Sequence, residues 1–216
     1  MSSRFVKARY DRVVDDASFA AGAARDVFVW DIDKTYLDTR FSSVRGLLGI
    51  PFELAIDKRA VAGTVPLLRA LRHGPRVESA LVPLYFISGS PMQMRNVVEK
   101  KMTMDGVQFD GITFKDQFGL LRAGRPRGIL EQIGYKLRAL LLYRREHPKN
   151  ARYLLFGDDV ERDTEAFLLF GETCAGLRGP PLADRLRTLG VHKSDVAGAV
   201  SLADALPIER DPVAHV

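Results

Sequence analysis

Short apolar runs bounded by polar turn residues recur along the chain, and helical spacing of apolar residues fills the intervals between them. The runs at 27–30, 84–87, 111–114 and 153–156 are typical of buried strands. The spacing within 65–71, 97–102, 133–141, 164–170 and 182–189 predicts helices. Because strands alternate with helices, we expect an α/β fold with a Rossmann-like, doubly wound parallel sheet.

The segments between these elements carry weaker patterns. Residues 10–24 have mixed helical character, and Pro91 suits the first position of the helix that follows the second strand. Residues 38–60 read as a small irregular insert, and the tail from 206 onwards is expected to be flexible. The 216 residues fit a single domain with no large cap domain, so the site should be open.

Composition adds few constraints. Apolar residues make up 46% of the chain, which suffices for a packed core, and the net charge of +5 comes from scattered basic residues. Cys174 is the only cysteine, so no intrachain disulfide forms and a reducing compartment is expected. Neither a signal peptide nor a membrane span is readable, so we expect a cytoplasmic protein.

Two of the predicted strands end in acidic residues. Asp31 and Asp33 follow the first strand, and Asp158 and Asp159 follow the last, with Asp163 at the start of the next helix. The carboxyl ends of parallel strands meet in one crevice, where several carboxylates repel each other unless a divalent cation holds them. Carboxylate oxygens suit Mg²⁺, so the pattern predicts a magnesium site and phosphoryl chemistry. The alternative is that these residues cap turns or helices, Asp163 especially.

The segment after the first strand offers two catalytic roles. Residues i and i+2 of a strand share a face, so Asp31 could attack a substrate while Asp33 exchanges protons. Thr35 completes a DxDxT motif and is a candidate substrate-binding residue. Ser88 follows the second strand, where its hydroxyl and the amides of Gly89 and Ser90 could bind a phosphate oxygen at a helix N-terminus. A plain helix cap is the alternative for Ser88.

Two lysines compete for the same site. Lys136 opens a predicted helix, so its side chain can lean toward the strand ends if the apolar stripe of that helix packs on the sheet. Lys115 directly follows a strand and shares a loop with Asp116, which could satisfy it locally. We therefore expect Lys136 within salt-bridge reach of Asp31, at about 2.7–2.9 Å.

The order of these motifs is more specific than any one of them. DxDxT after a strand, a serine after a strand, a lysine at a helix start and GDDxxxD after a strand lie between residues 27 and 171. This order resembles the four motifs of the haloacid dehalogenase-like phosphohydrolases. The resemblance implies that Asp31 is the nucleophile, Asp33 the general acid and base, Ser88 a phosphoryl ligand and Lys136 a stabilising cation.

The same resemblance implies a Mg²⁺ site. Asp158 and a nearby acid hold the ion in that family, and we expect it between Asp31 and Asp158, with the backbone carbonyl of Asp33 as a further ligand. Asp159 and Asp163 compete for the remaining contact, and the longer reach from the helix start favours Asp163.

A narrower resemblance concerns the substrate. Residues 60–63, residues 87–91 and the group Gly157, Asp158 and Asp163 look like the catalytic domain of the actin-patch type of phosphatidate phosphatase and its bacterial relatives. This resemblance implies a phospholipid or membrane-surface substrate. Lysine stands at position 34 where that family commonly has a third aspartate, and glycine at 89 where serine is usual.

These observations support a Mg²⁺-dependent phosphomonoesterase that works through an aspartyl-phosphate on a phosphorylated substrate, phosphatidate being one candidate. Two alternatives stay open. The net positive charge mildly favours a phosphatase acting on nucleic-acid ends or nucleotides. A non-catalytic scaffold of the same fold is the other alternative, although the intact acids and lysine argue against it.

Overall fold

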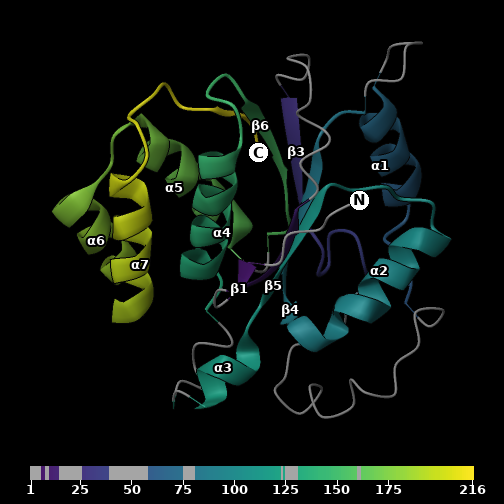
Figure 1. Ribbon diagram of the computed structural model, residues 1–216, viewed down its shortest axis with the longest axis horizontal. Coiled ribbons are helices and arrows are strands. Elements are labelled where there is room, and N and C mark those ends of the chain that lie inside the picture. Colours follow the sequence, from purple (N-terminus) through teal and green to yellow (C-terminus); the bar gives the residue numbers. More distant parts are fainter. Residues whose placement is uncertain are drawn as a thin grey trace.

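In the part of the chain that the structure describes, seven strands form a central sheet, with helices on both of its faces (Figure 1). The computed structural model describes residues 6–7, 10–14, 26–38, 58–74, 81–122, 124, 131–159 and 162–216. Strands are listed here in chain order: β1 (Val6–Lys7), β2 (Tyr10–Val14), β3 (Asp26–Asp31), β4 (Leu84–Pro91), β5 (Gly111–Lys115), β6 (Arg152–Phe156) and β7 (Val213–His215).

The strand order across the sheet is β1-β2-β5-β4-β3-β6-β7. The five strands from β5 to β7 are parallel to their neighbours, whereas β2 is antiparallel to β5 and β1 is antiparallel to β2. From β3 the chain first builds the sheet through β4 to β5, and later returns to the other side of β3 with β6. An open α/β sheet binds ligands where the order reverses in this way, which here is the carboxyl end of β3 and β6.

The helices divide between the two faces of the sheet (Figure 1). Helices α1 (Thr64–His73) and α2 (Arg95–Met104) lie on one face. Helices α4 (Ile133–Glu146), α5 (Asp163–Ala175), α6 (Gly179–Thr188) and α7 (Lys193–Asp204) lie on the other. A short helix α3 (Gln117–Arg122) follows β5.

Alternate side chains of β3 enter two separate cores. Val27 and Val29 pack with α4 and α5, while Phe28 and Trp30 pack with α1 and α2. A strand buried on both faces needs a continuous apolar run rather than an alternating one, which is what β3 has. The α/β class and the parallel sheet are therefore confirmed, and the strand order is compatible with a Rossmann-like fold.

The structure differs from the sequence-based expectations at several elements. Tyr10–Val14 forms strand β2 rather than helix, because its backbone pairs with the outer edge of β5. Pro91 ends β4 instead of opening a helix, and a 3₁₀ turn (Met92–Met94) separates it from α2. The tail expected to be flexible contains β7, which pairs with β6. The sequence analysis also missed α3 and α7.

The predicted insert falls largely outside the described part of the chain, since residues 39–57 are not described. The end of the insert contacts the segment that follows β3: Leu37 forms a β-bridge with Ala60, and the amide of Asp38 donates to the carbonyl of Arg59 at 2.9 Å. Within the described residues, none of the helices combines the length and the apolar character needed to cross a bilayer.

Candidate functional site at the ends of β3 and β6

Asp31 is the last residue of β3, and the chain turns sharply after it. The amides of Tyr36 and Leu37 donate to the carbonyl of Ile32 at 3.0 and 2.8 Å, and Lys34 adopts a left-handed backbone with φ of 65°. This turn holds the acidic segment over the carboxyl edge of the sheet. Thr35, a predicted substrate-binding residue, lies in the turn, where its hydroxyl donates to Asp31 Oδ2 at a long 3.4 Å.

Lys136 joins the two acidic segments. Its Nζ lies 2.8 Å from Asp31 Oδ1 and also contacts Asp163 Oδ1, and all three side chains are buried. Lys136 reaches this position because it lies in the first turn of α4, which follows β5 and so begins on the carboxyl side of the sheet. The distance agrees with the salt bridge expected from the sequence, whereas the catalytic role of Lys136 stays a prediction.

The rival Lys115 has a different environment. It is buried at the end of β5, where its Nζ donates to the backbone carbonyl of Glu131. The ammonium also lies 5.5 Å from the centroid of the Tyr135 ring, within the range of a cation–π contact. These contacts favour Lys136 as the lysine that serves Asp31.

Three carboxylates converge at the end of β6. Asp31, Asp158 and Asp163 each offer an oxygen, and these atoms lie within 4.8 Å of one another. These three residues are called the acid group below. Oxygen donors at this spacing fit a hard divalent cation such as Mg²⁺, although Lys136 already neutralises part of their charge. Asp159 is exposed and is not part of this group, so the arrangement favours Asp163, as the sequence suggests. The carbonyl of Asp33 as a further ligand stays a prediction.

The position of Asp163 depends on close contact between its side chain and the backbone of Gly157 and Asp158. The amide of Asp158 donates to Asp163 Oδ2 at 3.1 Å, and a Cβ on Gly157 would lie 2.5 Å from the Cβ of Asp163. Real Cβ atoms do not come that near to another atom, so residue 157 has to be glycine for Asp163 to stay where it is. The sequence analysis missed this role of Gly157.

Asp33 faces β4 rather than the acid group. Ser88 Oγ donates to Asp33 Oδ2 at 2.9 Å, and Ser90 donates to the same carboxylate from its hydroxyl at 2.8 Å and from its amide at 3.2 Å. Ser88, Gly89 and Ser90 belong to β4, so the expected helix N-terminus at these residues is wrong. Phosphate binding by Ser88 and Gly89 stays a prediction. The Ser90 hydroxyl was missed, although Ser88 and Ser90 stand two apart, as side chains on one face of a strand do.

Gly89 is covered by two glutamines. Gln117 Nε2 donates to the Gly89 carbonyl at 2.7 Å, and the side-chain amide of Gln132 fills the space where a Cβ on Gly89 would lie. Neither glutamine was singled out from the sequence, because nothing in their spacing distinguishes them from solvated side chains.

Burial and charge act in opposite directions on the buried ion pair. Burial raises the pKa of the Asp31 carboxyl well above its usual value, and Lys136 opposes this effect. Burial likewise raises the pKa of Asp163. Burial alone would lower the pKa of Lys136, but Asp31 and Asp163 outweigh it and hold that pKa above its usual value. Lys136 is therefore a permanent cation at the site.

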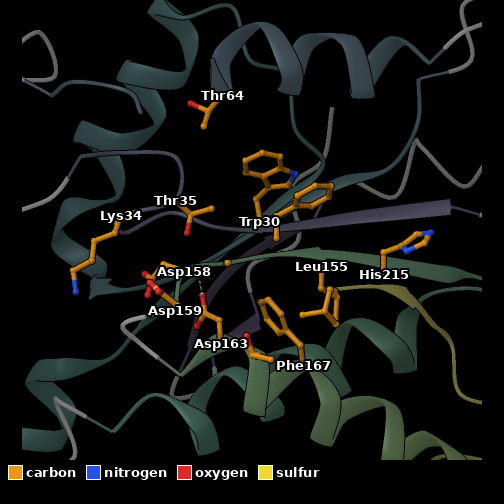
Figure 2. A pocket seen from close by; sticks show the side chains of 14 residues that line it. Trp30, Lys34, Thr35, Thr64, Leu155, Asp158, Asp159, Asp163, Phe167 and His215 are labelled. Atoms are coloured by element: carbon orange, nitrogen blue, oxygen red, sulfur yellow. Dashed lines mark hydrogen bonds between the residues drawn. The ribbon is translucent and has the colours of Figure 1, made fainter. Parts of the chain in front are cut away.

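A pocket of about 770 Å³ opens beside the acids. Figure 2 shows Lys34, Thr35, Asp158 and Asp159 gathered at one end of this pocket, with Leu155 and His215 lying toward the other. Asp158 and Asp163 belong both to the pocket lining and to the acid group, so a ligand in the pocket would lie next to the acid group. No family model, no curated protein and no solved structure matches this chain. The residues of the site itself are therefore the guide to its chemistry.

Proposed function

We propose that this protein is a Mg²⁺-dependent phosphomonoesterase of the haloacid dehalogenase-like type, with Asp31 as its nucleophile. One observation carries the proposal: Lys136 contacts both Asp31 and Asp163, while Asp158 completes a group of oxygens within 4.8 Å. Phosphoryl transfer needs mainly positioning and charge neutralisation, and a buried nucleophilic carboxylate beside a permanent cation provides both.

The first chemical step transfers the phosphoryl group to Asp31. A carboxylate oxygen of Asp31 forms a bond to phosphorus, the bond from phosphorus to the alcohol oxygen breaks, and Asp33 gives its proton to that oxygen. Lys136 stabilises the charge on the transferring group. Mg²⁺ held by Asp31, Asp158 and Asp163 would neutralise and orient the phosphoryl oxygens.

The second step regenerates the enzyme. Asp33 takes a proton from a water molecule as the water oxygen bonds to phosphorus, and the bond from phosphorus to Asp31 breaks to release inorganic phosphate. Ser88 has to change partner during this cycle, because its hydroxyl donates to Asp33 in the resting arrangement. A phosphoryl oxygen would compete with Asp33 for that hydroxyl, which would free Asp33 to turn toward the alcohol oxygen.

A substrate panel tests the proposal. Phosphorylated metabolites, phosphatidate and end-phosphorylated oligonucleotides are incubated with the protein, with Mg²⁺ and with a chelator, and released phosphate is measured. We expect Mg²⁺-dependent hydrolysis of at least one monoester and a loss of several orders of magnitude in Asp31→Asn, because the amide cannot attack phosphorus. Asp33→Asn should lower the rate by about 10²–10⁴.

Asp159→Asn is the matched control, because it removes an exposed carboxylate at the same edge that is not part of the acid group. Mass spectrometry of the acid-quenched protein should detect one added phosphoryl group on Asp31. Full activity in a folded Asp31→Asn protein would rule out the aspartyl-phosphate mechanism. If no compound of the panel is hydrolysed, the result would favour the non-catalytic scaffold. Preferential hydrolysis of the oligonucleotides would support the nucleic-acid alternative.

A further inference from the structure

Strand β4 contains a bulge beside Asp33. Ser88 and Pro91 pair with consecutive residues of β5, so Gly89 and Ser90 are inserted where β5 has no matching residues. A bulge re-aims the groups of the strand that carries it, and bulges are common next to active sites. Here the amide of Ser90 donates to Asp33 Oδ2 at 3.2 Å. The bulge therefore directs a backbone donor to the residue proposed as general acid and base.

Buried side chains from neighbouring elements hold this bulge in place. Gln117 Nε2 donates to the carbonyl of Gly89 at 2.7 Å, and the Tyr135 hydroxyl donates to the carbonyl of Ser88 at 2.8 Å. Backbone polar groups need a partner when they are buried, so these bonds stabilise the irregular backbone. They also fix the position of Ser90, which follows directly.

Ser90 contacts both oxygens of the Asp33 carboxylate. Its hydroxyl lies 2.8 Å from Oδ1 and 3.0 Å from Oδ2, in addition to the bond from its amide to Oδ2. Ser88 offers one donor, a hydroxyl 2.9 Å from Oδ2. A hydroxyl has a single proton that it can give to either oxygen. Ser90 can therefore stay bonded to one oxygen of Asp33 while the other turns.

The two serines suit different tasks in the proposed cycle. Ser88 leaves Asp33 for a phosphoryl oxygen, and a carboxylate held by Ser88 alone would then lose its orientation. Ser90 keeps two donors on Asp33, one of them a backbone amide that cannot rotate away. A general acid has to lie within about 2.6–3.2 Å of the atom that receives its proton, so a loss of orientation would slow proton transfer.

We propose that Ser90 is a positioning residue for Asp33. It holds the carboxylate at β4 while Ser88 binds the phosphoryl group, and so keeps one oxygen of Asp33 available for proton exchange with the alcohol and later with water. This inference rests on the proposed function, because the proton transfers that it assigns to Asp33 belong to that mechanism. Removing the Ser90 hydroxyl should therefore impair the steps that need a proton transfer and spare those that do not.

Two aryl esters separate proton transfer from phosphoryl binding. Phenyl phosphate depends on protonation of its leaving oxygen more than 4-nitrophenyl phosphate does, because 4-nitrophenolate is the more stable anion. Ser90→Ala should lower kcat/KM for phenyl phosphate by about 10–100-fold, the effect of one hydrogen bond to a charged group, and change kcat/KM for 4-nitrophenyl phosphate little. Ser88→Ala is the matched comparison. It should lower both values by similar factors, because the two esters share the phosphoryl group.

The second step of the cycle uses the same carboxylate, because Asp33 takes a proton from the attacking water. With 4-nitrophenyl phosphate, Ser90→Ala should therefore lower kcat while kcat/KM is retained, and a burst of 4-nitrophenol should appear as the aspartyl-phosphate accumulates. Ser90→Thr keeps the hydroxyl and should restore the wild-type behaviour. If Ser90→Ala fails to fold, Ser90→Cys takes its place, since a thiol has a similar shape and is only a weak donor.

Urea unfolding tests the contact without turnover. Ser90→Ala, Asp33→Ala and the double variant together give the coupling between the two positions, which we expect to be about 10-fold in the unfolding equilibrium constant. Additive effects would overturn the inference, and so would equal losses of kcat/KM for the two esters in Ser90→Ala. A wild-type protein that hydrolyses no monoester would instead refute the proposed function, and a measured coupling would then describe a structural contact without a catalytic role.

Discussion

Lys136 Nζ lies 2.8 Å from Asp31 Oδ1, and both side chains are closed to solvent. The same ammonium contacts Asp163, so a single cation serves two buried carboxylates. Removing one partner of a buried ion pair is costly, because the remaining charge stays buried without compensation. Lys136 is therefore expected to matter for folding as well as for any chemistry at Asp31.

Lys136→Met tests this dual role. Methionine is unbranched like lysine and lacks only the terminal ammonium position, so the variant leaves Asp31 and Asp163 without their cation. The free energy of unfolding should fall by about 3–5 kcal/mol, or less where Asp31 takes up a proton. Urea denaturation measures this change, and phosphatase assays measure the loss of turnover. Lys115→Met is the control, because it removes a buried lysine whose ammonium donates to a backbone carbonyl. A stable, active Lys136→Met protein beside an inactive Lys115→Met protein would reverse the assignment.

Mg²⁺ should stabilise the protein through the three converging acids. A ligand that binds only the folded state adds about 2.7 kcal/mol when its concentration is 100 times the Kd, so the melting temperature should rise with Mg²⁺ and fall back with a chelator. Asp158→Asn should remove most of this rise, whereas Asp159→Asn should keep it, because only Asp158 belongs to the acid group. Melting curves that coincide with and without Mg²⁺ would show that the acids do not bind the ion.

The contact between Asp31 and Lys136 could be expected from the sequence for a topological reason. In a parallel sheet, each crossover helix begins at the edge where the strands end, so a lysine in the first turn of α4 starts near the carboxyl end of β3. The acids of the β6 segment reach the same crevice because β6 pairs directly with β3. Parallel strands and the order of the elements along the chain are therefore sufficient to predict the contact between Asp31 and Lys136.

Other features depend on tertiary pairing that local patterns do not encode. β7 has neither an apolar run nor alternation, and it is a strand because the edge of β6 accepts it. The hydrogen bond from Ser88 to Asp33 depends on how closely the two side chains approach each other. A sequence pattern predicts the strands but not the distance between two side chains at their ends. The need for glycine at position 157 likewise follows from a contact with Asp163 that only the structure reveals.

Cys174 should be unreactive in the folded protein. Burial raises the pKa of its thiol to about 12, and the side chain is 3% exposed. A raised pKa means that little thiolate is present at neutral pH, and the thiolate is the reactive form. Labelling with a thiol-specific disulfide reagent should therefore be slow in buffer and accelerate in parallel with unfolding as urea is added. Rapid stoichiometric labelling without urea would contradict this assignment of Cys174 to the core.

Gly157→Ala should displace Asp163 without removing any charged group. The added Cβ would lie 2.7 Å from the carboxyl carbon of Asp163, and that carboxylate cannot move cheaply because Lys136 and the Asp158 amide hold it. Loss of a group that orients metal ligands typically costs about 10–100-fold in affinity or activity, so we expect losses of that size in kcat/KM and in the apparent affinity for Mg²⁺. Assays at varied Mg²⁺ and the Mg²⁺-dependent shift in melting temperature measure both.

Gly119→Ala provides the matched control for this last change. Gly119 lies on α3, and a Cβ there would also lie 2.7 Å from the carboxyl carbon of an aspartate, Asp116, which precedes α3 and is outside the acid group. Asp116 contributes no oxygen to the acid group, so Gly119→Ala should leave the Mg²⁺ response unchanged even if Asp116 shifts. Equal behaviour of the two variants would mean that Asp163 does not need its close approach to Gly157. The acid group would then have to function with Asp31 and Asp158 alone.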